Sequence, residues 1–217
     1  MNRILRELFW KIWWNTPWCA INRKFKSYKA RKNFDFDKNK DISIIAVNCV
    51  GGELYSILGL KFTSPLINSS LGRNDFALLA ANFNEYMQGN LTDFFYNKRN
   101  ELSCYLTSGN LKPLEIGWPH DHSEEEVVEK FKRRVKRINY EKLVFITDEI
   151  DMTDESYELF NSVNSFKKVV VAGKKCKKDY DFIEKINVDS VQGWQYKKLS
   201  GIFRFQTMWN FVDWFNK

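Results

Sequence analysis

The sequence is poor in the residues that break regular structure. Its 217 residues include only 4 Pro and 10 Gly, which argues against a loop-rich or fibrous fold. It also has no run of about 20 apolar residues, the length that crosses a bilayer as a helix. We therefore expect a protein without a membrane-spanning helix.

Cysteine and histidine are scarce as well. The 4 Cys form no Cys-x-x-Cys pair. The 2 His have no third candidate ligand at a sequence spacing typical of metal sites, so no metal site is predicted. A secretory signal is not expected, because Arg6, Glu7 and Lys11 interrupt the apolar stretch that it needs. The expected location is the cytoplasm, peripheral to the inner face of the membrane if the N-terminus binds lipid, with cysteines as thiols.

Apolar and aromatic residues are abundant. Apolar residues make up 44% and charged residues 28%, a globular composition. Aromatic residues reach 16%, so we expect some of these rings to face something other than the core.

The net charge of +7 is distributed unevenly along the chain. Residues 1–40 hold 11 Lys and Arg against 3 Asp and Glu, whereas the remainder holds 23 against 24. This change of composition predicts a basic arm and linker over 1–40, followed by a single α/β domain over 41–217. Whatever the basic charge binds, it is expected to bind at the N-terminus.

The arm begins with an amphipathic pattern over residues 2–15, which predicts a short helix ended by Pro17. Tryptophans with flanking cations suit the headgroup zone of an anionic membrane. The predicted membrane contacts are Trp10, Trp13, Trp14 and Lys11. The alternative is that the helix packs on the domain while the linker is solvated. Nucleic acid is not the expected partner, because no groove-reading motif accompanies the arm.

From residue 41 onward, short apolar runs alternate with helical periods. The expected strands are 41–48, 65–68, 142–147 and 168–172, with 103–106 and 114–116 as further candidates. The expected helices are 53–60, 74–87, 123–138, 153–160 and 206–215. This alternation predicts a mostly parallel, Rossmann-like sheet with helices on both faces.

Ligands of such sheets bind beyond the carboxyl ends of the strands. The first strand ends at Asn48 and Cys49, and Gly51 and Gly52 open the next helix. A cysteine there lies at a helix N-terminus, which stabilises a thiolate, and nearby amide groups can hold an oxyanion. The alternative is a small residue buried at a tight turn.

Both histidines lie in one loop, as His120 and His122, before the helix that Ser123 caps. The loop follows a candidate strand, so we expect it at a sheet edge, where an imidazole can act as a base. Asp148 and Asp151 follow another strand and are candidates to orient His120 or to hold a substrate hydroxyl. Surface-loop and turn roles are the alternatives.

These residues also resemble a bacterial family, the domain of unknown function nineteen-nineteen, whose members are often described as exopolysaccharide biosynthesis proteins. The matching positions are the runs 48–52, 58–61, 64–65, 123–126, 133–134 and 136–139, His120, and the aromatic tail 211–214. Val50 stands where the family commonly has an aromatic residue, and Asp121 and His122 also depart from it. The resemblance therefore extends to Cys49 and His120 but not to His122.

The resemblance implies a capsule or surface-polysaccharide setting, with a glycan or lipid-linked sugar as substrate. The Asn48-Cys49 pair is also distantly similar to some capsule O-acetyltransferases, so acetyl-CoA is the acyl donor by analogy only. We expect an acyltransferase with Cys49 as nucleophile or donor-site thiol and His120 as base. Asn48, Gly51 and Gly52 would hold the oxyanion, and Asp148 would orient His120. The alternatives are a glycosyl- or phosphosugar transferase using Asp148 and Asp151 with a metal, and a non-catalytic scaffold.

Overall fold

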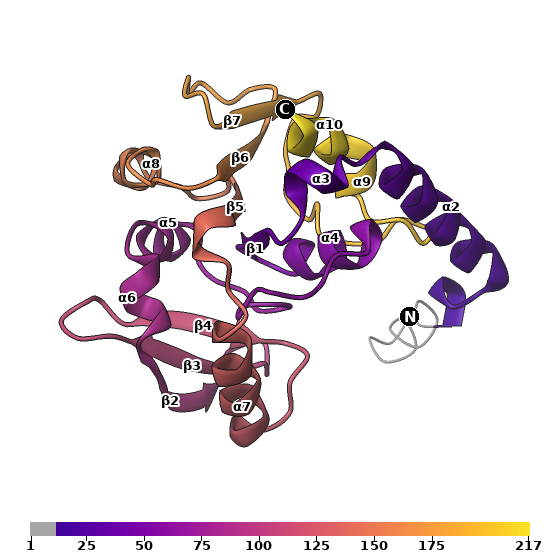
Figure 1. Ribbon diagram of the computed structural model, residues 1–217. Coiled ribbons are helices and arrows are strands. Elements are labelled where there is room, and N and C mark those ends of the chain that lie inside the picture. Colours follow the sequence, from indigo (N-terminus) through magenta and orange to yellow (C-terminus); the bar gives the residue numbers. More distant parts are fainter. Residues whose placement is uncertain (1–11) are drawn as a thin grey trace. The chain divides into compact units, whose positions relative to one another are not determined.

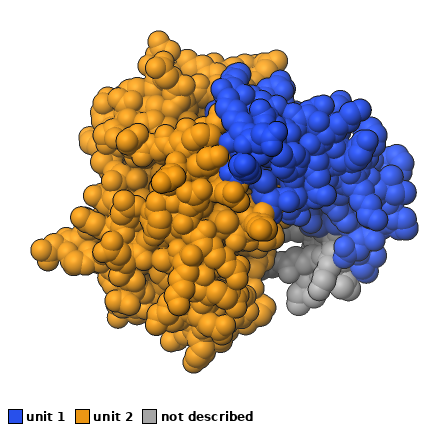
Figure 2. Space-filling view, viewed as in Figure 1, with its two compact units in different colours: residues 1–40, 56–60, 193–217 blue, residues 41–55, 61–192 orange. Residues whose placement is uncertain are grey.

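A computed structural model describes residues 12–217 (Figure 1). The chain forms two compact units, which are coloured separately in Figure 2. Unit 1 comprises residues 1–40, 56–60 and 193–217, and unit 2 comprises residues 41–55 and 61–192. Both sheets belong to unit 2, and together with the helices they confirm the α/β class.

Unit 2 contains a parallel sheet with the strand order β1-β5-β6-β7. Its strands are β1 (Ser43–Ala46), β5 (Leu143–Asp148), β6 (Lys167–Gly173) and β7 (Ile183–Ile186). β1 and β5 are buried along their whole length, because parallel strands are covered on both faces and therefore appear as continuous apolar runs. The sequence predicted all of these strands except β7.

A second sheet of unit 2 is antiparallel, with the order β2-β3-β4. Its strands are β2 (Asn90–Tyr96), β3 (Leu102–Thr107) and β4 (Leu114–Trp118). The prediction of one mostly parallel sheet was therefore right only for the other four strands. The physical reason lies in the connections, since loops as short as 97–101 and 108–113 join antiparallel neighbours, whereas a parallel pair needs a crossover.

The helices of this part of the chain lie in unit 2, except for residues 56–58 of the first of them, which belong to unit 1. They are α4 (Val50–Leu58), α5 (Arg73–Ala81), α6 (Phe83–Met87), α7 (Glu124–Val135), the short 3-10 helix η1 (Tyr140–Lys142) and α8 (Asp154–Asn161). Ser123 caps α7 by accepting a hydrogen bond from the Glu126 amide at 3.2 Å, and Thr153 caps α8, as predicted. The helix predicted to reach Met87 divides at Asn82. One hydrophobic core contains residues of both sheets.

The strand predicted at 65–68 is absent. Pro65–Asn68 instead form a buried turn, and Asn68 has a left-handed backbone with φ of +60°. The apolar residues of this run are buried without entering a sheet, which is why the sequence pattern was misleading. The residues after the turn connect the two sheets, as described below.

Unit 1 combines the N-terminal and C-terminal segments. Its helices are α2 (Pro17–Asn33), α3 (Phe36–Asn39), α9 (Phe205–Met208) and α10 (Phe211–Asn216). Residues 23–33, which we expected to form a linker, belong to α2, where Lys and Arg are good helix formers. The predicted C-terminal helix 206–215 is interrupted by Trp209 and Asn210.

The two ends of unit 1 are joined by side-chain amides. Asn216 donates to the Asn33 carbonyl at 2.7 Å and accepts from the Asp35 amide at 2.9 Å. Aromatic rings from both segments also pack together, for example Phe34 with Phe215 at 5.7 Å between centroids. Of the helix predicted over 2–15, only residues 12–15 are described; residues 12–14 are helical and Asn15 forms a turn. Within residues 12–217, no helix combines the length and the apolar character that crossing a membrane requires.

Candidate functional site

Cys49 and His120 lie side by side in unit 2. The half-buried Cys49 follows β1 and immediately precedes α4, while the exposed His120 lies two residues after β4. The Cys49 Sγ atom is 3.6 Å from the His120 Nε2 atom, a hydrogen-bond distance for sulfur. The two candidate residues, 71 positions apart in the sequence, therefore meet in space.

A short connector, residues 69–71, brings these two positions together. The Leu71 amide donates to the Val47 carbonyl at 3.0 Å, at the end of β1. Ser70 exchanges two backbone hydrogen bonds of 2.9 Å with Gly117 of β4. A Cβ atom at Gly117 would lie 2.6 Å from the Ser70 Oγ atom, so glycine permits this approach. The thiol thus comes from the parallel sheet and the imidazole from the antiparallel sheet.

The surroundings of Cys49 favour the uncharged thiol. Burial is the main cause of a raised pKa for Cys49, and the negative charges of Glu53 and Glu101 raise it further. A hydrogen bond from the Cys49 backbone amide acts in the opposite direction. These surroundings oppose the predicted stabilisation of a thiolate, because desolvation and two carboxylates act against the amide groups of the helix N-terminus. A nucleophilic Cys49 needs a base at the moment of attack.

Asn48 carries a buried hydrogen-bond donor that has no partner among the described residues. Its Oδ1 atom accepts from the Val50 amide at 3.0 Å, whereas its Nδ2 atom is buried and unpaired. An unpaired buried amide is costly, so a bound group that accepts this hydrogen bond would stabilise the site. The oxyanion role predicted for Asn48 needs such a free donor, and it stays a prediction.

The two glycines of α4 permit close packing. A Cβ atom at Gly51 would lie 2.9 Å from the Cβ atom of Ala46 on β1. A Cβ atom at Gly52 would collide with the side-chain oxygen of Asn68. These glycines therefore have a structural reason to be present, in addition to the backbone donor role predicted for them.

A cleft of about 700 Å³ also lies within unit 2, and Cys49 and His120 are not among its lining residues. It is lined by polar, charged and aromatic residues: Ser70, Gly72, Arg73, Asp75, Phe95, Tyr96, Asn97, Lys98, Arg99, Glu101, Glu115 and Gly117, together with Leu71. Two lining residues relate the cleft to the Cys49 site: Gly117 precedes His120 by three residues, and the charge of Glu101 raises the pKa of Cys49. The lining offers aromatic faces and hydrogen-bonding side chains of both charges.

Residues 20–216 match the family described as "Domain of unknown function (DUF1919)". The chain belongs to this family. The match begins within α2, so the DUF1919 domain extends further toward the N-terminus than the similarity visible in the sequence motifs.

A relative of this DUF1919 protein is an "Uncharacterized protein" of Haemophilus influenzae (strain ATCC 51907 / DSM 11121 / KW20 / Rd). The two are 29% identical over 207 residues, which cover 91% of this chain and 95% of the relative. The similarity therefore involves both units.

Asp148 forms a bidentate ion pair in the DUF1919 domain. The Arg73 guanidinium donates to both of its carboxylate oxygens at 2.8 Å, and the Ile150 amide donates to Oδ1 at 3.1 Å. Asp148 is fully buried, whereas Asp151 is exposed in a left-handed turn with φ of +57°. Orientation of His120 by Asp148 stays a prediction.

Within residues 12–217, no three potential metal-binding side chains of His, Cys, Asp or Glu gather into a cluster.

Sequence reasoning missed the residues that anchor the His120 loop. The neighbouring Asp121 is buried and accepts a hydrogen bond from the Lys130 ammonium of α7 at 2.5 Å. Lys130 also pairs with Glu126, and the pKa of Lys130 is raised, chiefly by its hydrogen bond to Asp121. The Glu126–Lys130 spacing of four residues on a helix indicates an ion pair and could have been recognised in the sequence. The contact of Lys130 with Asp121 depends on tertiary structure. His122 is exposed.

Two of the predicted membrane contacts have partners inside unit 1. The indole N–H groups of Trp13 and Trp14 donate to the carbonyls of Leu199 and Lys198, at 2.7 and 3.1 Å. Trp10 and Lys11 lie outside the described residues.

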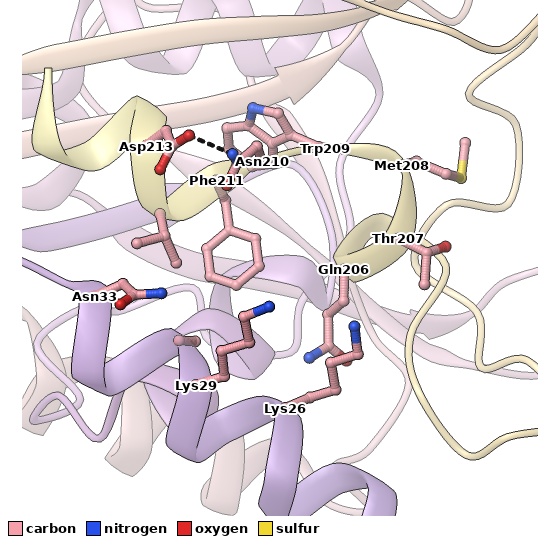
Figure 3. Close-up of a pocket in the computed structure, with 12 residues that line it drawn as sticks. Lys26, Lys29, Asn33, Gln206, Thr207, Met208, Trp209, Asn210, Phe211 and Asp213 are labelled. Carbon is pink, nitrogen blue, oxygen red and sulfur yellow. Dashed lines mark hydrogen bonds between the residues drawn. The ribbon is translucent and has the colours of Figure 1, made fainter.

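Unit 1 contains its own cavity, of about 450 Å³ (Figure 3). Lys26 and Lys29 extend from α2 toward Gln206 and Phe211 on the opposite wall. Asn210 and Asp213 of that wall are hydrogen-bonded to each other (Figure 3). The cavity is therefore basic and polar, and its chemistry differs from that of the Cys49 site.

Proposed function

We propose that the protein is a cysteine- and histidine-dependent acyltransferase that modifies a glycan precursor in bacterial surface-polysaccharide biosynthesis. The observation that carries this proposal is the distance of 3.6 Å between Cys49 Sγ and His120 Nε2. A thiol beside an imidazole is the pairing that nucleophilic catalysis requires. The polysaccharide setting comes from the resemblance of the motifs to exopolysaccharide biosynthesis proteins.

The first half-reaction would transfer the acyl group to the enzyme. The Cys49 sulfur attacks the carbonyl carbon of a thioester donor while His120 takes the thiol proton, because the raised pKa keeps the resting thiol protonated. The tetrahedral intermediate collapses by breaking the donor carbon–sulfur bond, and His120 returns the proton to the departing thiolate. The product is an acyl-Cys49 thioester.

The second half-reaction would transfer the acyl group to a sugar hydroxyl. His120 takes the hydroxyl proton as the oxygen attacks the thioester, and the same proton returns to the Cys49 sulfur as it leaves. The unpaired Asn48 Nδ2 atom is the donor that we assign to the oxyanion of both intermediates.

The lining of the 700 Å³ cleft in unit 2 supports a sugar as the acceptor. Sugars present hydroxyl groups to carboxylates and apolar C–H faces to aromatic rings. Glu101 and Glu115 supply carboxylates in the cleft, and Phe95 and Tyr96 supply rings. Lys98 and Arg99 add positive charge at the same rim, which suits a phosphorylated precursor.

The decisive experiment is to trap the acyl-enzyme. The purified full chain is incubated with acetyl-CoA or with p-nitrophenyl acetate, quenched in acid and analysed by peptide mass spectrometry. We expect acetylation of Cys49, loss of that label in Cys49→Ala, and slowing by roughly a hundredfold or more in His120→Ala.

Cys176→Ala is the matched control, since Cys176 is also partly exposed and its pKa is also raised by burial. This variant should be acetylated at Cys49 as fast as the wild type. Absence of a Cys49 adduct with both donors, or equal labelling of Cys49 and Cys176, would rule out the acyl-transfer proposal.

A further inference from the structure

Helix α2 exposes a line of large apolar side chains. Trp18, Ile21, Phe25 and Tyr28 are each between 60% and 66% exposed. Their spacing of three, four and three residues places them on one face of the helix, which we call the apolar stripe. The stripe extends from Trp18 to Tyr28, ten residue steps and roughly 15 Å along the helix axis.

The opposite side of α2 fixes this orientation. Cys19 and Ala30 are buried, and Arg23 donates to the Trp14 carbonyl at 2.6 Å. Arg31 donates to the carbonyls of Ile57 and Ser56, also within unit 1, at 2.9 and 2.8 Å. The helix is thus held by its own unit on one side and presents the stripe on the other.

The charges around the stripe have one sign. α2 contains six Lys and Arg residues and no Asp or Glu. The exposed Lys24 and Lys32 border the stripe, by the helical repeat of 100° per residue. Residues 12–40, 56–60 and 193–217, the described part of unit 1, hold 12 basic against 3 acidic residues. A second copy docked on this face would bring like charges together, so the complementary surface is anionic.

The residue types favour the headgroup region of a bilayer. Indole and phenol rings combine an apolar body with a polar end, and lysine can bury its aliphatic chain while its ammonium stays in water. Leu199, which is 65% exposed, lies beside the helix, since its carbonyl accepts from Cys19 Sγ at 3.6 Å.

We propose that the apolar stripe of α2, with Lys24 and Lys32, binds the surface of an anionic lipid bilayer. The rings of Trp18, Phe25 and Tyr28 enter the interface, and the lysines contact lipid phosphates. This surface differs from the contacts expected from the sequence, which were Trp10, Trp13, Trp14 and Lys11. The proposal is independent of the chemistry of Cys49.

Vesicle sedimentation with the full chain tests the proposal. We expect binding to mixed phosphatidylcholine–phosphatidylglycerol vesicles and much weaker binding to phosphatidylcholine alone. The double variant Phe25→Ser/Tyr28→Ser should lower the partition coefficient about tenfold or more, because two interfacial rings are lost. Lys24→Glu/Lys32→Glu should reduce binding to the anionic vesicles, with less effect of added salt than in the wild type.

Tyr140→Ser is the control, since Tyr140 is also an exposed tyrosine, at 45%, but belongs to unit 2. It should bind vesicles like the wild type. A second readout avoids the serine variants: brominated lipids should quench the tryptophan fluorescence of the wild type, and Trp18→Phe should lose part of that quenching. The proposal is overturned if the wild type does not bind anionic vesicles, or if the stripe variant binds them unchanged. Self-association that the stripe variant abolishes, without vesicle binding, would instead identify a second copy as the partner.

Discussion

At the scale of single residues, the behaviour of Cys49 is decided by competing electrostatic effects. A position before a helix favours a thiolate, but burial and the carboxylates of Glu53 and Glu101 favour the thiol. The consequence for the proposed chemistry is that His120 acts as a base during attack, and a preformed ion pair with Cys49 is not required. The pH dependence of the thiol distinguishes these two situations.

We predict that the rate of Cys49 alkylation by iodoacetamide rises at a higher pH than that of a free cysteine, whose pKa is about 8.5. Only the thiolate reacts, and the raised pKa lowers its fraction at any given pH near neutrality. Glu53→Gln removes a negative charge, so it should lower the pKa and speed alkylation. The measurement is a pH series of peptide-resolved alkylation rates.

Glu155→Gln serves as the control because Glu155 is an exposed carboxylate on α8 that does not perturb Cys49. It should leave the profile unchanged. A Cys49 profile at lower pH than that of free cysteine would contradict this account and restore the thiolate prediction.

At the scale of elements, the site depends on how closely α4 packs on β1. Alanine normally stabilises a helix relative to glycine by about 0.5–1 kcal/mol. At Gly51 the opposite is expected, because the new Cβ atom would lie 2.9 Å from the Ala46 Cβ atom. The helix would have to move away from the strand and carry Cys49 with it.

We predict that Gly51→Ala lowers the free energy of unfolding by about 1–3 kcal/mol, the usual cost of overpacking. Ala46→Gly removes the opposing methyl group, so the double variant should be less destabilised than the sum of the two single variants. Urea unfolding of the four proteins in this cycle measures the coupling. Strict additivity would show that the two Cβ atoms do not compete for space.

The sequence predicted elements whose burial leaves a simple pattern. β1, β5 and β6 are β-branched runs in the sequence because both faces of the sheet are covered. The start of α7 is marked in the sequence by its capping residue, Ser123. β2 was missed, since its register is disturbed between Thr92 and Phe95 and most of its residues are only partly buried. α2 was missed because its large apolar residues face outward, which no core pattern reveals.

At the candidate site, the sequence identified positions but not contacts. The sequence placed Cys49 and His120 each after a strand but left open whether they meet, and the structure brings them to 3.6 Å. The Ser70–Gly117 exchange and the Asp121–Lys130 ion pair could not be predicted, because each joins segments whose proximity only the fold determines. The Arg73–Asp148 pair belongs to the same group.

At the scale of the whole molecule, charge is divided between the units. The described part of unit 1 has 12 basic and 3 acidic residues, whereas unit 2 has 19 basic and 23 acidic residues. Concentrated like charge destabilises a compact unit by self-repulsion, and salt screens it. Unit 1 should therefore gain stability from salt more than unit 2 does.

We predict that raising NaCl from about 0.05 to about 0.5 M slows alkylation of Cys19 more than that of Cys104 under native conditions. Both thiols are fully buried, with Cys19 in unit 1 and Cys104 in unit 2, so each reacts only when its own surroundings open. Peptide mass spectrometry compares the two rates in one sample. Equal slowing at both cysteines would show that the units open together.

The connection of the two sheets through Ser70 and Gly117 also has a consequence during synthesis. Cys49 leaves the ribosome 71 residues ahead of His120, so a growing chain carries an ordinary thiol with no base beside it. Under the proposed chemistry, reactivity appears only after β4 has been made and the Ser70–Gly117 hydrogen bonds have formed. If the proposed chemistry holds, the order of the segments along the chain keeps the nascent chain from reacting with acyl donor before it has folded.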